Sequence, residues 1–292
     1  MPSLRALSEA HEVHAVYTRP DRPAGRKLVV TPTPVKVAAR SLGLDVFTPE
    51  RLDAAFVSLA EGLHPQLLAA VAYGKMLPRS LLDISGMTAL NAHPSLLPLY
   101  RGAAPIQAAL RDGRDQTGVS VIWMSAEMDA GDVALSRAIP IRADDDYGTL
   151  LARLAALAAE LMIEAAARLA SGTLPRVPQD PGLATYVKPI SKSDQRLRFD
   201  EPAVRLANVV RSLSPKPGAW LEIEGKRIKV LAARAEPTPP EHAGTAAGQI
   251  IAADDAGPLM ACSQGALRLL RVVPEGKAAM AGADFVRALN RR

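Results

Sequence analysis

The chain has 292 residues, of which 48% are apolar, enough for two globular domains with a sizeable core. Its longest apolar stretch, residues 150–169, is interrupted by four charged side chains, and its N-terminus lacks the apolar core of a signal peptide, so we expect neither a membrane span nor secretion. The single cysteine, Cys262, excludes an internal disulfide framework and is typical of a cytoplasmic protein.

The positive charge of the chain is unevenly distributed. The formal net charge is +5, yet residues 1–187 hold 18 Lys and Arg against 19 Asp and Glu, whereas residues 188–292 hold 17 against 11. The whole positive excess therefore lies in the C-terminal third. Such asymmetry favours a polyanionic partner, although charge that only keeps the protein in solution explains it as well.

The first two thirds of the chain alternate helix-like and strand-like segments. The predicted helices cover residues 2–7, 34–42, 103–111 and 146–170. The predicted strands cover residues 13–17, 67–73, 87–90, 118–124 and 134–141. This alternation predicts a doubly wound α/β domain over residues 1–171.

The composition changes after Ser171. Residues 172–190 are rich in Pro and Gly and are typical of a linker. Beyond it, helices over residues 201–213 and 281–289 flank five predicted strands, at residues 219–223, 226–234, 248–252, 258–263 and 266–273. Five short strands with little helix predict a small OB-like β-barrel domain over residues 191–292.

The most informative motif directly follows the predicted strand 87–90 and runs Asn-Ala-His-Pro-Ser-Leu-Leu-Pro from Asn91 to Pro98. Residues two apart on a strand point to the same side, so Asn91 and His93 are expected to project together. An amide donor beside an imidazole can polarise a carbonyl and move a proton. A lone histidine is more often a core residue, and it is the pairing with Asn91 that favours catalysis.

Two acidic residues are candidates for a third catalytic group. Asp129 and Asp132 lie in a Gly-containing loop after the predicted strand 118–124. Asp and Gly often only shape turns, so the residues alone leave both candidates open. The sequence has no His/Cys cluster with metal-ligand spacing, no Gly-x-Gly-x-x-Gly string and no P-loop, so we expect no metal and no nucleotide site.

The string from Asn91 to Pro98 resembles the signature of folate-dependent formyltransferases. The Arg-Gly-Ala-Ala-Pro-Ile string at residues 101–106 is similar to the methionyl-tRNA formyltransferases in particular, and further similar segments at residues 185–194, 215–220, 225–230 and 265–277 extend the resemblance over nearly the whole chain. The resemblance implies that Asn91, His93 and Asp129 are catalytic, with Asp129 preferred over Asp132.

The resemblance also implies the formyl donor, 10-formyltetrahydrofolate. The residues that match the folate-contacting loop of the family are Ser95, Leu96, Leu97 and Pro98. Residues 71–78 resemble another wall of the same pocket. An apolar cleft with a few main-chain hydrogen bonds suits a flat pterin ring. Core packing is the alternative interpretation of the two leucine side chains.

A basic segment resembles the loop with which the family enters the acceptor stem of initiator methionyl-tRNA. Its expected phosphate contacts are Arg19, Arg22, Arg26 and Lys27. This chain departs from the family by carrying Leu28, Val29 and Val30 where the family has more lysine. A solvated basic loop is the alternative interpretation.

The resemblance implies a cytoplasmic, monomeric enzyme that transfers a formyl group from 10-formyltetrahydrofolate to the amino group of methionyl-initiator-tRNA, for translation initiation. Two alternatives stay open. One is another 10-formyltetrahydrofolate enzyme, which formylates a sugar nucleotide or hydrolyses the donor. The other is a tRNA-binding protein without catalytic activity.

One expected element is missing from the sequence. In the family, the first helix follows a strand and a Gly-Thr-Pro turn, whereas this chain begins at that helix, with Pro2. The first strand of a doubly wound sheet is usually central. We therefore expect a gap in the sheet that exposes the edges of the neighbouring strands.

Overall fold

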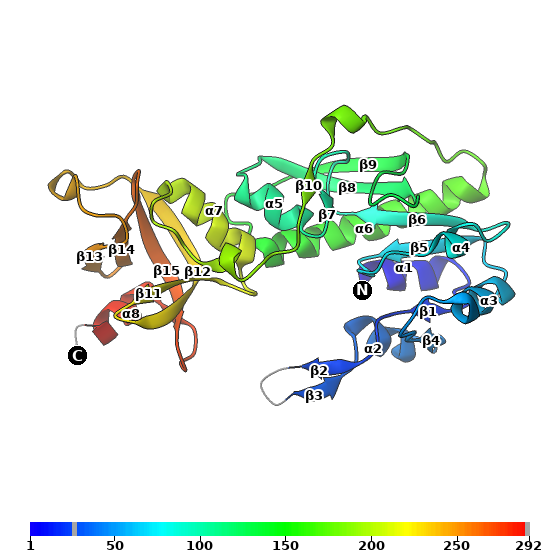
Figure 1. The fold of residues 1–292 in the computed structure, drawn as a ribbon, viewed down its shortest axis with the longest axis horizontal. Coiled ribbons are helices and arrows are strands. Elements are labelled where there is room, and N and C mark those ends of the chain that lie inside the picture. Colours follow the sequence, from blue (N-terminus) through cyan, green and yellow to red (C-terminus); the bar gives the residue numbers. More distant parts are fainter. Residues whose placement is uncertain (25–27, 290–292) are drawn as a thin grey trace. The chain divides into compact units, whose positions relative to one another are not determined.

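The computed structural model describes residues 1–24 and 28–289. The chain divides into two compact units, each assembled from three segments. Unit 1 comprises Met1–Ala103, Thr117–Ile139 and Ala152–Val187, and unit 2 comprises Ala104–Gln116, Pro140–Leu151 and Lys188–Arg292. Figure 1 gives the order of the elements along the chain.

Unit 1 is built on a four-stranded sheet. The strands follow the order β5 (Leu67–Val71), β6 (Thr88–His93), β8 (Gln116–Trp123) and β9 (Val133–Pro140). β5 and β6 are parallel, whereas β6 and β8 are antiparallel, so the sheet is mixed. Beyond this sheet, β1 (Val16–Tyr17) and β4 (Val46–Phe47) form a separate parallel pair.

The helices of unit 1 begin at residues that satisfy their first N–H groups. The side chain of Thr33 accepts a hydrogen bond from Lys36 N at the start of α2 (Pro34–Ser41), and that of Asp53 accepts from Phe56 N at the start of α3 (Ala54–Gly62). The remaining helices are α1 (Pro2–Ala10), α4 (Arg79–Leu82) and the long α6 (Tyr147–Ala170).

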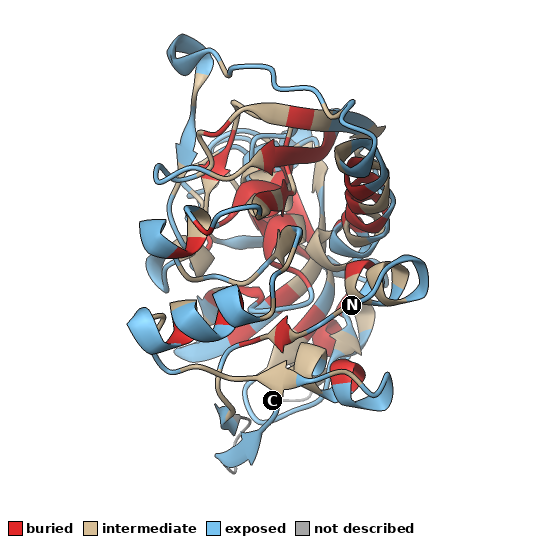
Figure 2. Cartoon of the chain, turned by 90° about the vertical axis from the view of Figure 1, so that its right-hand side faces the viewer, coloured by how far each residue is buried: buried red, intermediate tan, exposed pale blue. Residues whose placement is uncertain are grey.

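Helix α6 runs along one face of the sheet (Figure 1), and Figure 2 colours the buried residues of the chain red. Leu154, Leu157, Leu161 and Ala165, spaced three or four residues apart, are buried. On the outer side of the contact, Arg137 of β9 forms ion pairs with two glutamates of α6. The helix that the sequence predicts over residues 146–170 is thus present, with Glu160 and Arg168 exposed and Arg153 and Glu164 half-buried.

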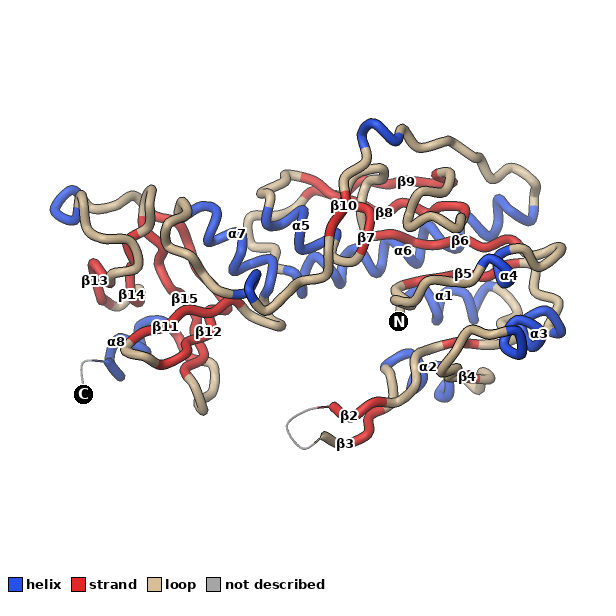
Figure 3. Tube along the Cα trace, viewed as in Figure 1, coloured by secondary structure: helices blue, strands red, loops and turns tan. Residues whose placement is uncertain are grey.

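Three small features complete unit 1 (Figure 3). β2 (Arg22–Ala24) and β3 (Val29–Thr31) form an antiparallel hairpin in the segment that the sequence analysis described as a loop. β7 (Arg101–Gly102) pairs in parallel with β10 (Tyr186–Val187), and the short 3-10 helix η1 (Pro181–Leu183) precedes β10. Residues 175–187, here called the strap, therefore return to the sheet after α6.

Unit 2 combines helices with an antiparallel sheet. The sheet order is β11 (Ala219–Ile223), β12 (Lys226–Glu236), β15 (Ala266–Pro274), β14 (Gly257–Ala261) and β13 (Ile250–Asp254), and β16 (Met280–Ala281) also pairs with β15. The helices are α5 (Pro105–Arg111), α7 (Ala203–Leu213) and α8 (Gly282–Leu289), with 3-10 turns η2 (Ser193–Gln195) and η3 (Pro240–His242).

The core of unit 2 lies between α7, α8 and this sheet. Leu206 and Leu213 of α7 are buried together with Val230, Leu267 and Phe285. β11 buries one face, whereas all five residues of β14 are buried, and Leu259 and Ala261 belong to a second apolar cluster with Ile251 and Ala266. Among all the described helices, none combines the length and the apolar character needed to cross a membrane.

Candidate active site

Asn91 and His93 lie at the carboxyl end of β6, on the same face of the strand. The antiparallel register pairs Asn91 with Ile122 and His93 with Ser120 of β8. His93 is only 4% exposed. The neighbouring strands thus hold both side chains in fixed positions at one end of the sheet.

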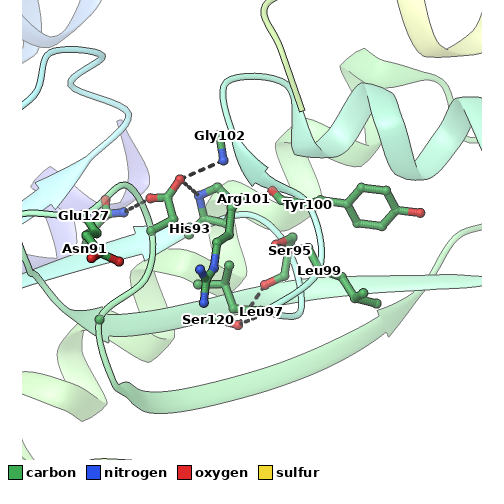
Figure 4. A network of polar contacts seen from close by, with 12 residues as sticks. Asn91, His93, Ser95, Leu97, Leu99, Tyr100, Arg101, Gly102, Ser120 and Glu127 are labelled. Carbon is green, nitrogen blue, oxygen red and sulfur yellow. Dashed lines mark hydrogen bonds and ion pairs between the residues drawn. The ribbon is translucent and has the colours of Figure 1, made fainter. Parts of the chain in front are cut away.

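Asp129 completes this cluster from the loop between β8 and β9. Its Oδ2 lies 3.5 Å from His93 Nδ1 and accepts a 2.9 Å hydrogen bond from Gly102 N. Its Oδ1 lies 3.5 Å from Asn91 Nδ2. Figure 4 shows Asn91, His93 and Gly102 gathered within this polar network. The three residues predicted to be catalytic are therefore brought together by the fold.

The hydrogen bonds of His93 define its orientation. Nε2 lies 2.9 Å from the carbonyl oxygen of Tyr100, and because a carbonyl only accepts, Nε2 carries a hydrogen. Nδ1 is then left facing the carboxylate of Asp129. A proton that reaches Nδ1 is held between the two groups, so the pair can take up a proton and hold it within the site.

Asp132 has a different environment. Its carboxylate lies 3.3 Å from Arg176 Nε, and its carbonyl accepts a hydrogen bond from Trp123 N. The structure therefore places Asp129 against His93, and Asp132 against Arg176 of the strap.

The loop from Ser95 to Pro98 is fastened to β8 next to His93. Ser120 Oγ donates to the carbonyl of Ser95 (2.8 Å) and accepts from Leu97 N (3.1 Å). Ser95 itself is fully buried, and its hydroxyl donates to the carbonyl of Leu99 at 2.6 Å. Leu96, Leu97 and Pro98 are half-buried. The serine side chain thus shapes the loop, and the side chain of Leu96 packs against Gly118 of β8.

The second predicted wall, residues 71–78, contains a buried polar atom with no partner. The hydroxyl of Tyr73 makes no hydrogen bond, and burial raises the pKa of this side chain. Lys75 of the same segment donates to the carbonyls of Pro49 and Glu50. The lysine therefore supports the segment and does not present its charge to the site.

The predicted tRNA-contacting residues occupy two places. The guanidinium of Arg19 lies against Gly74, and Arg22 is on the β2–β3 hairpin, opposite Thr31. Arg26 and Lys27 lie outside the described residues. Further along the hairpin, Leu28, Val29 and Val30 are 70%, 60% and 63% exposed. At its base, Lys36 forms a 2.7 Å ion pair with Asp21.

Two residues of the site were not predicted from the sequence. Gly102 has φ +106, and a Cβ there would lie 2.5 Å from the carbonyl oxygen of Val187, so the position requires glycine. Gln179 of the strap hydrogen-bonds to the backbone of Asp129. Gly102 belongs to the Arg-Gly-Ala-Ala-Pro-Ile string at residues 101–106, and this is the only sequence signal for it. Gln179 had no such signal, because it lies in the segment predicted to be a linker.

Metal ligands do not gather anywhere in the described part of the chain. Within residues 1–24 and 28–289, no three His, Cys, Asp or Glu side chains are grouped so that they could hold a metal ion.

Comparison with known proteins identifies the class to which this site belongs. A model of the formyl transferase family matches residues 3–166, and a model of the formyl transferase C-terminal domain matches residues 189–290. HypX from Aquifex aeolicus in complex with tetrahydrofolic acid has the same fold, with a TM-score of 0.62, 20% identity and coverage of 86% of this chain and 43% of its own. The fold and the site therefore define a formyl transferase.

Curated relatives narrow the class. Methionyl-tRNA formyltransferase of Macrococcus caseolyticus is 41% identical, over 98% of this chain and 91% of its own length. The enzyme of the same name from Pseudomonas paraeruginosa is 43% identical, over 97% of this chain and 90% of its own. The chain belongs to the methionyl-tRNA formyltransferase family.

Proposed function

We propose that this enzyme transfers the formyl group of 10-formyltetrahydrofolate to the amino group of methionyl-initiator-tRNA, for translation initiation. The observation that carries this proposal is the convergence of Asn91, His93 and Asp129 at the end of β6, in a chain of this family. A formyl transfer needs a hydrogen-bond donor that stabilises the developing oxyanion and a group that accepts the proton of the amine, and these three side chains supply both.

The proposed roles follow from the contacts. The methionyl amine attacks the formyl carbon, a new C–N bond forms, and the carbon's bond to N10 of the folate breaks. An amide has two N–H donors, so Asn91 can turn one toward Asp129 and the other toward the developing oxyanion. The proton lost by the amine passes to the His93–Asp129 pair, and N10 regains a proton as it leaves.

Three half-buried residues support the folate site. Leu96, Leu97 and Pro98 follow the catalytic strand directly, and Ser120 holds their loop beside His93. An apolar wall of this kind fits a flat ring better than it fits a charged ligand.

The charge of unit 2 supports tRNA as the partner. Residues 188–292 carry 17 basic against 11 acidic residues. On β11, the ring of Trp220 has the guanidinium of Arg227 at 4.3 Å and that of Arg196 at 5.4 Å from its centroid. Stacking on an aromatic ring fixes the orientation of a guanidinium and keeps its charge available to phosphates.

We also propose the finer organisation of the chain. The functional parts are a catalytic domain (1–171), a linker (172–190) and a tRNA-binding domain (191–292) with an OB-like barrel. The two family models end at residue 166 and begin at residue 189, and the unmatched segment between them supports these boundaries. On β15, one edge pairs with β12 while β14 and β16 share the other, which supports a curved sheet. We propose that the enzyme is cytoplasmic and monomeric, as its family resemblance implies.

We further propose that one more strand, preceding α1, lies between β1 and β5. Within the described residues, β1 pairs only with β4 and β5 pairs only with β6, so each has an edge without a partner. All five residues of β5 are half-exposed. The hydroxyl of Tyr17, on β1, and that of Tyr73, just after β5, are buried without a partner. A strand in this place would pair with the free edges of β1 and β5 and cover β5, and the strand and its turn would supply partners for the two hydroxyls.

Formylation assays test the function. The chain, extended at its N-terminus by the strand proposed above, is incubated with 10-formyltetrahydrofolate and with methionyl-initiator-tRNA, an amino-sugar nucleotide, or no acceptor, and the formylated product and free tetrahydrofolate are measured. We expect the methionyl-tRNA to be formylated. Formylation of the sugar nucleotide alone, or donor hydrolysis without an acceptor, would establish the enzymatic alternative instead. Tight tRNA binding with no turnover of any kind would establish the non-catalytic one.

A further inference from the structure

Asp129 is the third residue of a turn that the hydrogen bond from Ala130 N to the carbonyl of Glu127 closes at 3.5 Å. Its φ is +52, a region that residues with a Cβ rarely adopt. The turn lies between β8 and β9, and its closing hydrogen bond is long. Contacts from elsewhere in the chain are therefore important for keeping the carboxylate against His93.

The strap supplies this support through one side chain. The Nε2 atom of Gln179 donates hydrogen bonds to the carbonyl oxygens of Asp129 (2.8 Å) and Gly131 (2.7 Å). Its Oε1 accepts from Arg101 Nε (3.1 Å) and Nη2 (2.7 Å). All four hydrogen-bonding positions of the amide are used, so its orientation is defined by its partners.

The same contacts join the two segments that hold the carboxylate. Arg101 is 4% exposed, and its Nη1 also donates to the hydroxyl of Tyr186 at 3.0 Å. The next residue, Gly102, donates its N–H to Asp129 Oδ2. Gln179 thus fixes the backbone of Asp129 relative to the strand whose N–H binds the carboxylate of Asp129.

We propose that Gln179 is a positioning residue for catalysis, which holds Asp129 in register with His93 and Asn91. The proposal rests on the proposed function of Asp129. In this proposal the strap contributes a positioning residue to the active site and is not only a linker. A misplacement of a reacting group by about 1 Å can lower a rate by about 100-fold, so the expected effect is large although Gln179 does not touch the reacting atoms.

The amide chemistry defines a sharp substitution. In Gln179→Glu the side chain keeps its length and its contact with Arg101, but a carboxylate oxygen replaces the Nε2 donor beside two carbonyl oxygens. Gln179→Met keeps the volume and removes both sets of hydrogen bonds without adding charge. Gln66→Glu is the matched control, because Gln66 is an exposed residue of unit 1 just before β5, at the opposite end of the sheet from His93.

The experiment measures kcat and KM for both substrates, together with thermal melting, in the same N-terminally extended protein as the formylation assays. We expect Gln179→Glu to lower kcat by about 10- to 100-fold with little change in either KM, and Gln179→Met to lower it less. Gln66→Glu should retain the wild-type kcat. A wild-type kcat in both Gln179 variants would overturn the proposal. It would also be overturned if the activity fell only in proportion to the folded fraction, because the role would then be structural.

A double-mutant cycle separates this proposal from the proposed function. If Gln179 acts through Asp129, Gln179→Glu should have little further effect in an Asp129→Asn background. Equal effects in both backgrounds would overturn the positioning role alone. A wild-type rate in Asp129→Asn would instead remove the catalytic assignment of Asp129, and with it the basis of this inference.

Discussion

The Nδ1 atom of His93 lies 3.5 Å from Oδ2 of Asp129, while the opposite ring nitrogen of His93 contacts the carbonyl of Tyr100. The ring is therefore held at both ends, one by a main-chain acceptor and the other by a carboxylate. This arrangement fixes the ring plane and leaves one position where a proton can be exchanged. It is the geometry that general acid–base chemistry requires.

The first prediction concerns the three side chains of this cluster. We expect Asn91→Ala to lower kcat by about 100- to 1,000-fold, as for the loss of one oxyanion donor. His93→Ala and Asp129→Ala should each lower it by about 100- to 10,000-fold, as for a general acid–base group. The dissociation constant of the folate, measured by calorimetry, should change far less. A near-wild-type kcat in His93→Ala would contradict the assignment.

The second prediction concerns Gly102. Gly102→Ala should reduce kcat strongly, because the new Cβ meets the carbonyl of Val187 and must displace the N–H that binds Asp129. Gly172→Ala is the control, since Gly172 also has a positive φ (+68) but no atom within 4 Å of its Cβ position. Both variants should lose about 1 kcal/mol of stability from the backbone strain alone. Equal kcat values would show that the Gly102 contact is dispensable.

The sequence predicted the regular elements well, because their apolar periodicity reflects one buried face. The predicted strand over residues 219–223 agrees with β11, and the helix over 146–170 agrees with α6 to one residue. The pairing of Asn91 with His93 was predictable because residues two apart on one strand point to the same side. Short elements such as α4 and the β2–β3 hairpin were missed, because four or fewer residues carry too little periodicity. The nine-residue α3 was missed as well, because most of its residues are apolar and mark no single face.

The contacts that complete the site could not be predicted from local patterns. Asp129 and Asp132 are equivalent by composition, and only the resemblance selected between them. Gln179 reaches the site because the strap returns to the sheet after α6, and β10 then pairs with β7. Such long-range pairings are set by the whole fold, so a Pro-rich segment was interpreted as a linker although part of it contributes to the site.

The third prediction concerns tRNA affinity. The logarithm of the association constant should fall linearly with the logarithm of the salt concentration, because phosphate contacts release counterions. Arg227→Gln should reduce this slope by about 1. Arg168→Gln removes the same charge from α6, where Arg168 is paired with Glu164, and should leave the slope unchanged. An affinity independent of salt would argue against unit 2 as a phosphate-binding surface.

The fourth prediction concerns Cys262. Burial raises the pKa of its thiol to about 11, so the native protein at pH 8.5 should hold about 100-fold less thiolate than a free cysteine. Alkylation by iodoacetamide should accordingly be slow in the native state and fast in denaturant. Because unfolded chains lose this proton at lower pH than folded ones, the thiol should also make stability fall as pH rises toward 11. Equal native and denatured alkylation rates would contradict this environment.

The fifth prediction concerns the gap between β1 and β5. A net stability of about 5–15 kcal/mol leaves little margin for two unpaired strand edges and a half-exposed β5. We expect the chain starting at Met1 to express poorly or aggregate, with little activity. The chain should become soluble and active when the residues that precede the matched region in the Macrococcus caseolyticus relative are fused to its N-terminus.

A scrambled sequence of the same length and composition is the control for this fusion, because it adds the same mass without the strand pattern. Thermal melting and formylation of methionyl-initiator-tRNA are compared for the three proteins. In the native fusion, the hydroxyls of Tyr17 and Tyr73 should gain partners, so Tyr17→Phe and Tyr73→Phe should destabilise the fusion and have little effect on the unextended chain. Equal melting temperatures and equal rates for all three proteins would mean that the edges of β1 and β5 need no further strand.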